Sequence, residues 1–144
     1  MINVRLVAEY ILRRFGGMPA MKLQKLVYYC QAWSLVWDDA PMFDARIEAW
    51  ANGPVVPELY AAHRGFYGVE PGMFTKAQEL EIPAQTRDTI ERVVAFYGQH
   101  SSQWLSDLTH AEAPWRNARA GIPDGERGNE EITLESMSEY YSSL

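Results

Sequence analysis

The spacing of apolar residues over the first 40 positions predicts two helices that pack against each other. Between residues 3 and 15 apolar side chains recur three or four positions apart, Asn3 is a suitable N-cap, and Gly16-Gly17 ends the pattern. A second helix is expected over 19–38, with Pro19 near its first turn and a wide apolar face. A DNA-reading helix-turn-helix also has a short glycine-containing turn, but the long second helix and its wide apolar face favour packing.

Aromatic residues of the second helix lead to two further expectations. Trp33 and Trp37 lie four positions apart on one helical face, so we expect both in the core. Tyr28 and Tyr29 are adjacent and cannot point the same way, so one of them is a candidate for exposure.

The helical period breaks after residue 38. One or two short extended pieces are expected between residues 42 and 50, because side chains of opposite character alternate from Ile47 to Ala51. Asn52-Gly53-Pro54 forms a rigid corner, and Pro57 suits the first turn of a helix that ends near residue 63 or 64. Trp50 stands beside this corner, where it suits either core packing or an interface with another protein.

The remainder of the chain predicts more helices joined by loops. Residues 65–83 are rich in Gly and Pro and are expected to form a loop with short strands near 73–75 and 80–82. Helices are expected over 84–98, after a cap at Ser101 or Ser102, from Pro114 to about residue 121, and over about 133–143 after a cap at Thr133. Residues 121–131 are expected to form an exposed loop. The predicted fold is mainly α: a compact single-domain helical bundle over 1–144, with about six or seven helices and a small β element near residues 42–52 and 73–82.

Composition narrows the possible partners. The chain has 144 residues and a formal charge of −6, and the acids concentrate after residue 66: residues 1–66 carry seven Lys/Arg and six Asp/Glu, and residues 67–144 carry six and thirteen. This balance argues against nucleic acid, which binds clustered basic faces, and permits a basic protein partner. A basic face could be built only from a small set of residues, namely Arg5, Arg13, Arg14, Lys22 and Lys25.

Location follows from what the sequence lacks. No run of about 18 apolar residues occurs, so no membrane span is expected. The N-terminus shows no signal-peptide pattern, and the single cysteine excludes an internal disulfide. A cytoplasmic protein is therefore expected.

Catalytic and metal-binding patterns are incomplete. His110-Ala-Glu112 matches half of a zinc deaminase signature, but the paired cysteines that complete that signature are missing, since Cys30 stands alone. The three histidines are scattered, Cys30 lies on an apolar helix face, and no phosphate-binding glycine loop occurs. We therefore expect no enzyme activity, no catalytic residues, no metal site and no cofactor. His110 and Glu112 are expected mainly to satisfy local structure.

Three stretches in order resemble one known family. LQKLVYYCQAWSLVW at 23–37, PMFDARIEAWANGPVVPELY at 41–60 and LSDLTHAEAPWRNAR at 105–119 are similar to the Panacea domain of SocA-like antitoxins. The motif blocks therefore span 23–60 and 105–119. The resemblance implies a compact, mostly helical domain that neutralises the toxin of a two-gene toxin–antitoxin system in bacteria or phages.

The resemblance leads to an expected function with two alternatives. We expect an antitoxin that binds and neutralises a cognate protein toxin, by masking it or by presenting it to an ATP-dependent protease as an adaptor. Candidate toxin-interface or motif positions are Tyr29, Trp50, Asn52, Gly53, Pro54, Tyr60, His110, Glu112 and Trp115. The alternatives are a small regulator that binds DNA through the first two helices, and a hydrolase that uses the His110–Glu112 loop.

Overall fold

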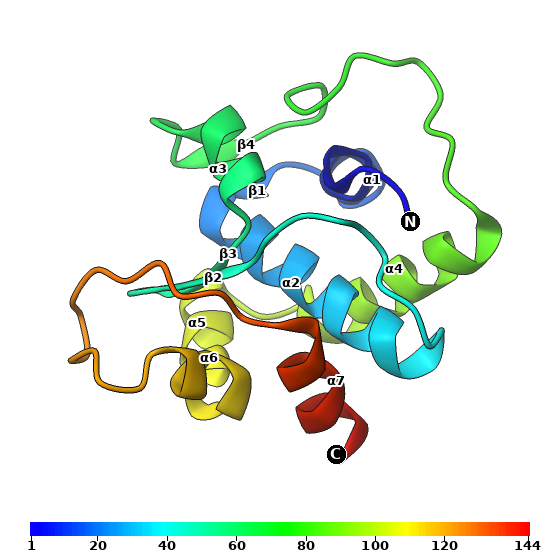
Figure 1. The fold of residues 1–144 in the computed structure, drawn as a ribbon. Helices are drawn as coiled ribbons and strands as arrows, with labels where there is room; N and C mark the ends of the chain where they lie inside the picture. The colour runs from blue at the N-terminus through cyan, green and yellow to red at the C-terminus, as the bar shows by residue number, and fades with distance from the viewer.

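The computed structural model describes all 144 residues and contains seven helices and four very short strands (Figure 1). The elements in chain order are α1 (Val4–Phe15), β1 (Met18–Pro19), α2 (Ala20–Trp37), β2 (Glu48–Trp50), β3 (Gly53–Val55), α3 (Pro57–His63), β4 (Gly68–Val69), α4 (Ala84–Tyr97), α5 (Ser102–Ala111), α6 (Ala113–Ala118) and α7 (Leu134–Ser142). The predicted mainly helical fold with small β elements is confirmed.

Helix α2 is the centre around which the other elements pack. It contacts α4, α7, α5 and β3, and Figure 1 shows these elements on different sides of it. Because α2 is covered on several sides, Tyr28 and Tyr29 are both buried, so the expectation that one is exposed is wrong. The core expectation for the tryptophans holds only in part. Trp33 is half-buried, whereas Trp37, at the helix end, is 37% exposed, with the Arg92 guanidinium 3.9 Å from its ring centroid.

Three helix starts follow the side-chain caps expected from the sequence. Asn3 Oδ1 accepts a hydrogen bond from the Arg5 amide at 2.8 Å, and Ser101 and Thr133 accept from amides three residues ahead. The caps fix where α1, α5 and α7 begin, because they satisfy amides that have no partner inside the helix.

The β structure agrees with the prediction at one place and departs from it at another. Strands β2 and β3 pair antiparallel, with Trp50 opposite Gly53, as the extended pattern near 42–52 suggested. No strand forms over 73–82; the second pair joins β1 to β4 instead. For residues 73–75 the physical reason lies in Glu9, a fully buried residue of α1. Its carboxylate accepts hydrogen bonds from the amides of Gly72, Phe74 and Thr75, which are therefore not available to a strand ladder.

The segment before α7 closes one edge of β2. Most of residues 121–131 are exposed, as expected. At the end of this loop, however, the Ala49 amide donates to the Glu130 carbonyl and the Ile132 amide donates to the Ile47 carbonyl, each at 2.8 Å. The loop is thus held beside the β2–β3 turn. None of the seven helices combines the length and apolar character needed to cross a bilayer.

Candidate functional site

The turn between β2 and β3, called the elbow here and comprising residues 48–56, is held in place from two sides. On one side, residues of α5, of α6 and of the position directly after α6 donate to three of its carbonyls. Trp115 Nε1 donates to the Trp50 carbonyl at 2.9 Å, and Ser106 Oγ donates to the Asn52 carbonyl at 2.7 Å. The buried Arg119 donates to the Ala49 carbonyl at 3.0 Å. The elbow is therefore a rigid feature.

On the other side of the elbow, the side-chain amide of Gln24 in α2 forms two hydrogen bonds with the backbone of Val56, as a neighbouring strand would. The Val56 amide donates to Gln24 Oε1 at 2.8 Å, and Gln24 Nε2 donates to the Val56 carbonyl at 3.3 Å. Gln24 Nε2 also lies 3.0 Å from His63 Nε2. All three residues are buried, so these bonds satisfy polar groups that water cannot reach.

Gly53 allows close contact between the elbow and α2. Its φ is +124°, a conformation that other residues rarely adopt. A Cβ at this position would lie 2.5 Å from Lys25 Cε and 3.1 Å from Thr109 Oγ1. The missing side chain therefore provides the space into which the Lys25 side chain extends.

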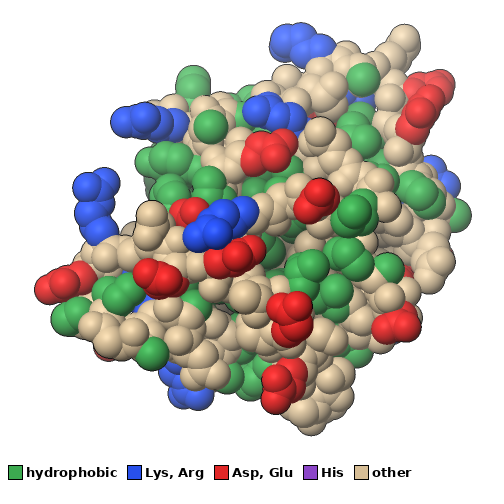
Figure 2. Space-filling model, in the orientation of Figure 1, with side chains coloured by type: hydrophobic (Ala, Val, Ile, Leu, Met, Phe, Trp, Pro, Cys, Tyr) green, Lys and Arg blue, Asp and Glu red, His purple; other side chains and the backbone are tan.

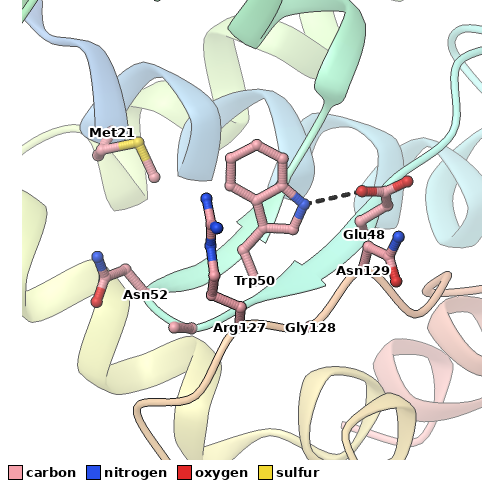
Figure 3. Close-up of a pocket in the computed structure, with 8 residues that line it drawn as sticks. Met21, Glu48, Trp50, Asn52, Arg127, Gly128 and Asn129 are labelled. Carbon is pink, nitrogen blue, oxygen red and sulfur yellow. Dashed lines mark hydrogen bonds between the residues drawn. The ribbon is translucent and has the colours of Figure 1, made fainter.

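Two pockets border the elbow. The first, called the Trp50 pocket, has a volume of about 600 Å³. It is lined by Met21, Glu48, Trp50, Ala51, Asn52, Arg127, Gly128 and Asn129. Figure 3 shows the Trp50 ring standing between the labelled side chains, with its Nε1 directed at Glu48. That hydrogen bond is 2.8 Å long, and the Tyr60 ring packs edge-on against Trp50 with centroids 4.8 Å apart. Trp50 is thus half-buried and fixed in one orientation.

The second pocket, called the Lys25 pocket, has a volume of about 580 Å³ and shares Met21 and Asn52 with the first. Its fourteen lining residues also come from β1, α3, the following loop and α5. They are Pro19, Ala20, Met21, Lys25, Asn52, Tyr60, His63, Gly65, Phe66, Tyr67, Ser102, Gln103, Ser106 and His110.

Two ionisable groups of the Lys25 pocket are shifted in the same direction. Burial lowers the pKa of Lys25 to about 8, and the side chain is only 1% exposed. Burial, and then the charge of Lys25, lower the pKa of His110. The His110 ring stacks on Trp115 with centroids 3.9 Å apart, and its Nε2 is buried without a hydrogen-bond partner.

Glu112 belongs to a separate buried cluster behind the elbow. Its Oε1 accepts hydrogen bonds from the hydroxyls of Tyr29 and Tyr141, each at 2.7 Å, and the Tyr141 hydroxyl also lies 3.0 Å from that of Tyr28. Burial raises the pKa of Glu112, and the two hydroxyl donors partly oppose that rise. The cluster ties α7 to α2. A hydrolase centred on His110 and Glu112 would need both side chains at one open pocket, whereas only His110 lines one.

The nine predicted site residues divide into two groups. Trp50, Asn52, Tyr60 and His110 line one or both pockets. The other five are buried: Gly53 and Pro54 belong to the elbow itself, Trp115 supports it, and Tyr29 and Glu112 belong to the separate cluster that joins α2 to α7. The pocket-lining residues Met21, Lys25 and Arg127 did not stand out in the sequence as site residues. Lys25 lies outside the predicted apolar face of the helix, and its burial follows from the packing of other elements around all sides of α2.

Neither a metal centre nor a basic face is assembled. No three His, Cys, Asp or Glu side chains lie close enough to hold a metal ion. Of the five basic residues considered for DNA binding, Lys25 is buried. Arg13 and Arg14 form ion pairs with Glu9 and Glu91, and Lys22 Nζ donates to the Gly98 carbonyl at 2.6 Å. These residues do not form one open cationic surface.

Comparison with known proteins gives one consistent result. A family model described as "Antitoxin SocA-like, Panacea domain" matches residues 23–116, which include most of α2, the whole elbow, half of the residues of the Trp50 pocket and most of those of the Lys25 pocket. The protein named Antitoxin SocA, from Caulobacter vibrioides (strain NA1000 / CB15N), is 27% identical over 129 residues, with 79% of this chain and 69% of that protein covered. No solved structure matches the chain. Since the family match spans more than half of its length, the chain belongs to the SocA-like antitoxin family with a Panacea domain.

Proposed function

We propose that this chain is an antitoxin that binds a cognate protein toxin and neutralises it, acting as a binding protein without enzyme activity of its own. The observation that carries this proposal is the family match over residues 23–116. The same residues contain the elbow and three of its supports, Gln24, Ser106 and Trp115. The segment by which the family is recognised therefore contains the elbow that separates the two pockets and most residues of the Lys25 pocket.

The surface formed by Trp50 and Asn52 of the elbow and the neighbouring Tyr60, called the elbow surface here, has the properties of a protein-binding site. Trp50 and Tyr60 are half-buried, and their rings contact each other, so little side-chain entropy is lost when a partner covers them. Tyrosine and tryptophan in fixed positions next to pockets are the residues that most often dominate binding free energy. Asn52 is exposed at the tip of the turn and offers a polar contact between the two pockets.

The negative charge of this chain favours association with a basic toxin. Residues 67–144 hold thirteen of the 19 acids. Figure 2 shows acidic side chains spread over one face, with exposed hydrophobic atoms between them and fewer basic side chains. Such a field speeds association with a positively charged protein and becomes weaker as salt is added.

Neutralisation has two routes that the proposal distinguishes by experiment. In masking, the toxin stays intact in a stable complex. In adaptor action, the antitoxin presents the toxin to an ATP-dependent protease, and the toxin half-life in cells becomes shorter when the antitoxin is present. A pulse-chase of the toxin with and without this chain separates the two routes.

Co-expression with the product of the adjacent gene tests the proposal. The wild-type chain is expected to restore growth and to copurify with the toxin. Trp50→Ala is expected to weaken rescue, while Trp37→Ala, which truncates a partly exposed tryptophan at the far end of α2, is expected to rescue fully. Absence of both rescue and copurification with the wild-type chain would overturn the proposal.

A further inference from the structure

Lys25 has features that packing does not explain. The residue is 1% exposed, and burial alone depresses the pKa of its ammonium group. Its Nζ forms none of the ion pairs in the structure, and, unlike His110 Nε2, it is not fully buried but opens onto the pocket. An unpaired buried charge is unfavourable, and a methionine of similar length would fill the same space without it. A cation kept at such a position indicates a role in binding.

The surroundings of Lys25 favour a negatively charged ligand. None of the fourteen residues that line the Lys25 pocket is Asp or Glu, although the chain contains 19 of them. His110 lines the pocket and keeps a buried Nε2 without a partner. Ser102 and Gln103 of the first turn of α5 also line it, and the N-terminal end of a helix attracts negative charge.

The number of charges points to one class of anion. The pocket offers one ammonium group, and the other available donors are neutral groups such as the hydroxyls of Tyr60 and Ser102. Phosphates and nucleic acids are bound by several Lys or Arg side chains, whereas a carboxylate carries a single charge that one ammonium can match. The pocket is bordered by Phe66 and Tyr67, which are 61% and 85% exposed. Exposed aromatics around a polar centre are typical of a surface that another protein covers.

We propose that the Lys25 pocket receives a carboxylate of the bound toxin, from an Asp or Glu side chain or from its C-terminus, with Lys25 as the cationic anchor. This inference rests on the proposed antitoxin function. In this proposal the elbow positions the Lys25 side chain. Gly53 leaves space for Lys25 Cε and Nζ, and Ser106 and Gln24 hold the elbow against that side chain.

The first test uses the protein alone. The chain has three lysines, so a sample with ¹³C at lysine Cε gives three resonances that can be followed against pH. Saturating N-acetylglycine, which carries a single carboxylate, is expected to raise the pKa of Lys25 by about one unit, which corresponds to tenfold stronger binding to the charged amine. The exposed Lys76 is the internal control and is expected not to change. An unchanged Lys25 resonance, or a larger shift with inorganic phosphate than with N-acetylglycine, would overturn the assignment of a carboxylate.

The second test uses the toxin. Lys25→Met is expected to lower toxin affinity at least tenfold while the thermal midpoint stays equal or rises, and Lys76→Met is expected to bind as wild type. Wild-type affinity of Lys25→Met would refute the inference. If the wild-type chain binds no toxin at all, the proposed function fails, and the resonance of Lys25 still decides whether the pocket binds carboxylates. Extending the toxin by a short Gly-Ser tail separates the two sources, because only a C-terminal carboxylate is moved by it.

Discussion

Replacing Lys25 by methionine is expected to make the folded chain more stable near neutral pH. Burial depresses the pKa of Lys25 from 10.5 to about 8. A difference of that size corresponds to about 3 kcal/mol of unfavourable free energy when the group is charged in the folded state. Methionine has a similar length and no charge, so the Lys25→Met variant is expected to gain up to about 3 kcal/mol at pH 7.

The stability gained by Lys25→Met depends on pH. The folded chain loses the Lys25 proton near pH 8 and the unfolded chain near 10.5, so the unfolded state binds more protons between these values. Wild-type stability therefore rises relative to the variant as pH increases from about 8, and the difference between the two shrinks. Burial raises the pKa of Tyr28, Tyr29 and Tyr141, which lowers stability above about pH 10 in both proteins and cancels in the comparison.

Urea denaturation followed by circular dichroism at pH 7 and pH 9.5 measures this effect. With a slope of about 2 kcal/mol per molar urea, a gain of about 3 kcal/mol moves the midpoint by roughly 1.5 M. Lys76→Met, at an exposed position, is expected to change stability by less than about 0.5 kcal/mol at either pH. A Lys25→Met variant that is less stable than wild type at pH 7, or whose gain is the same at both pH values, would refute the account of Lys25 as an unpaired buried charge.

Three other substitutions test the supports of the fold and the elbow. Gly53→Ala introduces both backbone strain and a close contact and is expected to lower the free energy of unfolding, measured by thermal denaturation, by about 2–4 kcal/mol. Gly121→Ala, with a φ of +89° and open space around it, is expected to cost about 1 kcal/mol. Equal losses in the two variants would contradict the close contact between residue 53 and Lys25. Glu9→Gln is expected to expose the 72–75 amides to hydrogen exchange and to cost about 2–4 kcal/mol at pH 7. Although burial raises the pKa of Glu9, its bonds to Arg13 and three amides lower it overall, so this stabilisation is present above pH 4.5 and lost as the pH falls. The stability difference between wild type and Glu9→Gln is therefore expected to shrink in acid, and a difference that stays the same at low pH would contradict the assignment. Tyr141→Phe is expected to cost about 1–2 kcal/mol of unfolding free energy, and Tyr140→Phe, whose hydroxyl makes no hydrogen bond, is the control.

Helices could be predicted from the sequence because the signals that set them are local. Asn3, Ser101 and Thr133 each cap a helix through an amide two or three residues ahead, so their role depends only on nearby sequence. The prolines at 57 and 114 lie in the first turns of α3 and α6 for the same kind of reason. The corner at Asn52-Gly53-Pro54 was also predicted, since Gly53 has the positive φ that such a corner needs.

Contacts between distant segments could not be predicted. Glu9 lies more than sixty residues from the amides it binds, and no local sequence pattern near either segment predicts these hydrogen bonds. The strand expected near 73–75 does not form for this reason. Likewise, a buried polar side chain can be satisfied or left unpaired. Gln24 is satisfied by Val56, whereas Lys25, its neighbour, has no partner, and only the three-dimensional arrangement distinguishes them.

Direct binding between the purified chain and the purified toxin tests the central claim, that the elbow surface binds a toxin. Isothermal titration calorimetry is expected to give saturable binding for wild type, with affinity lowered at least tenfold by Trp50→Ala and changed less than threefold by Trp37→Ala. Thermal midpoints of both variants are measured alongside, so that an affinity loss at unchanged stability identifies contact with the toxin. Saturable binding that both variants retain equally would contradict the placement of the interface at the elbow, and absence of binding by wild type would contradict the antitoxin function itself.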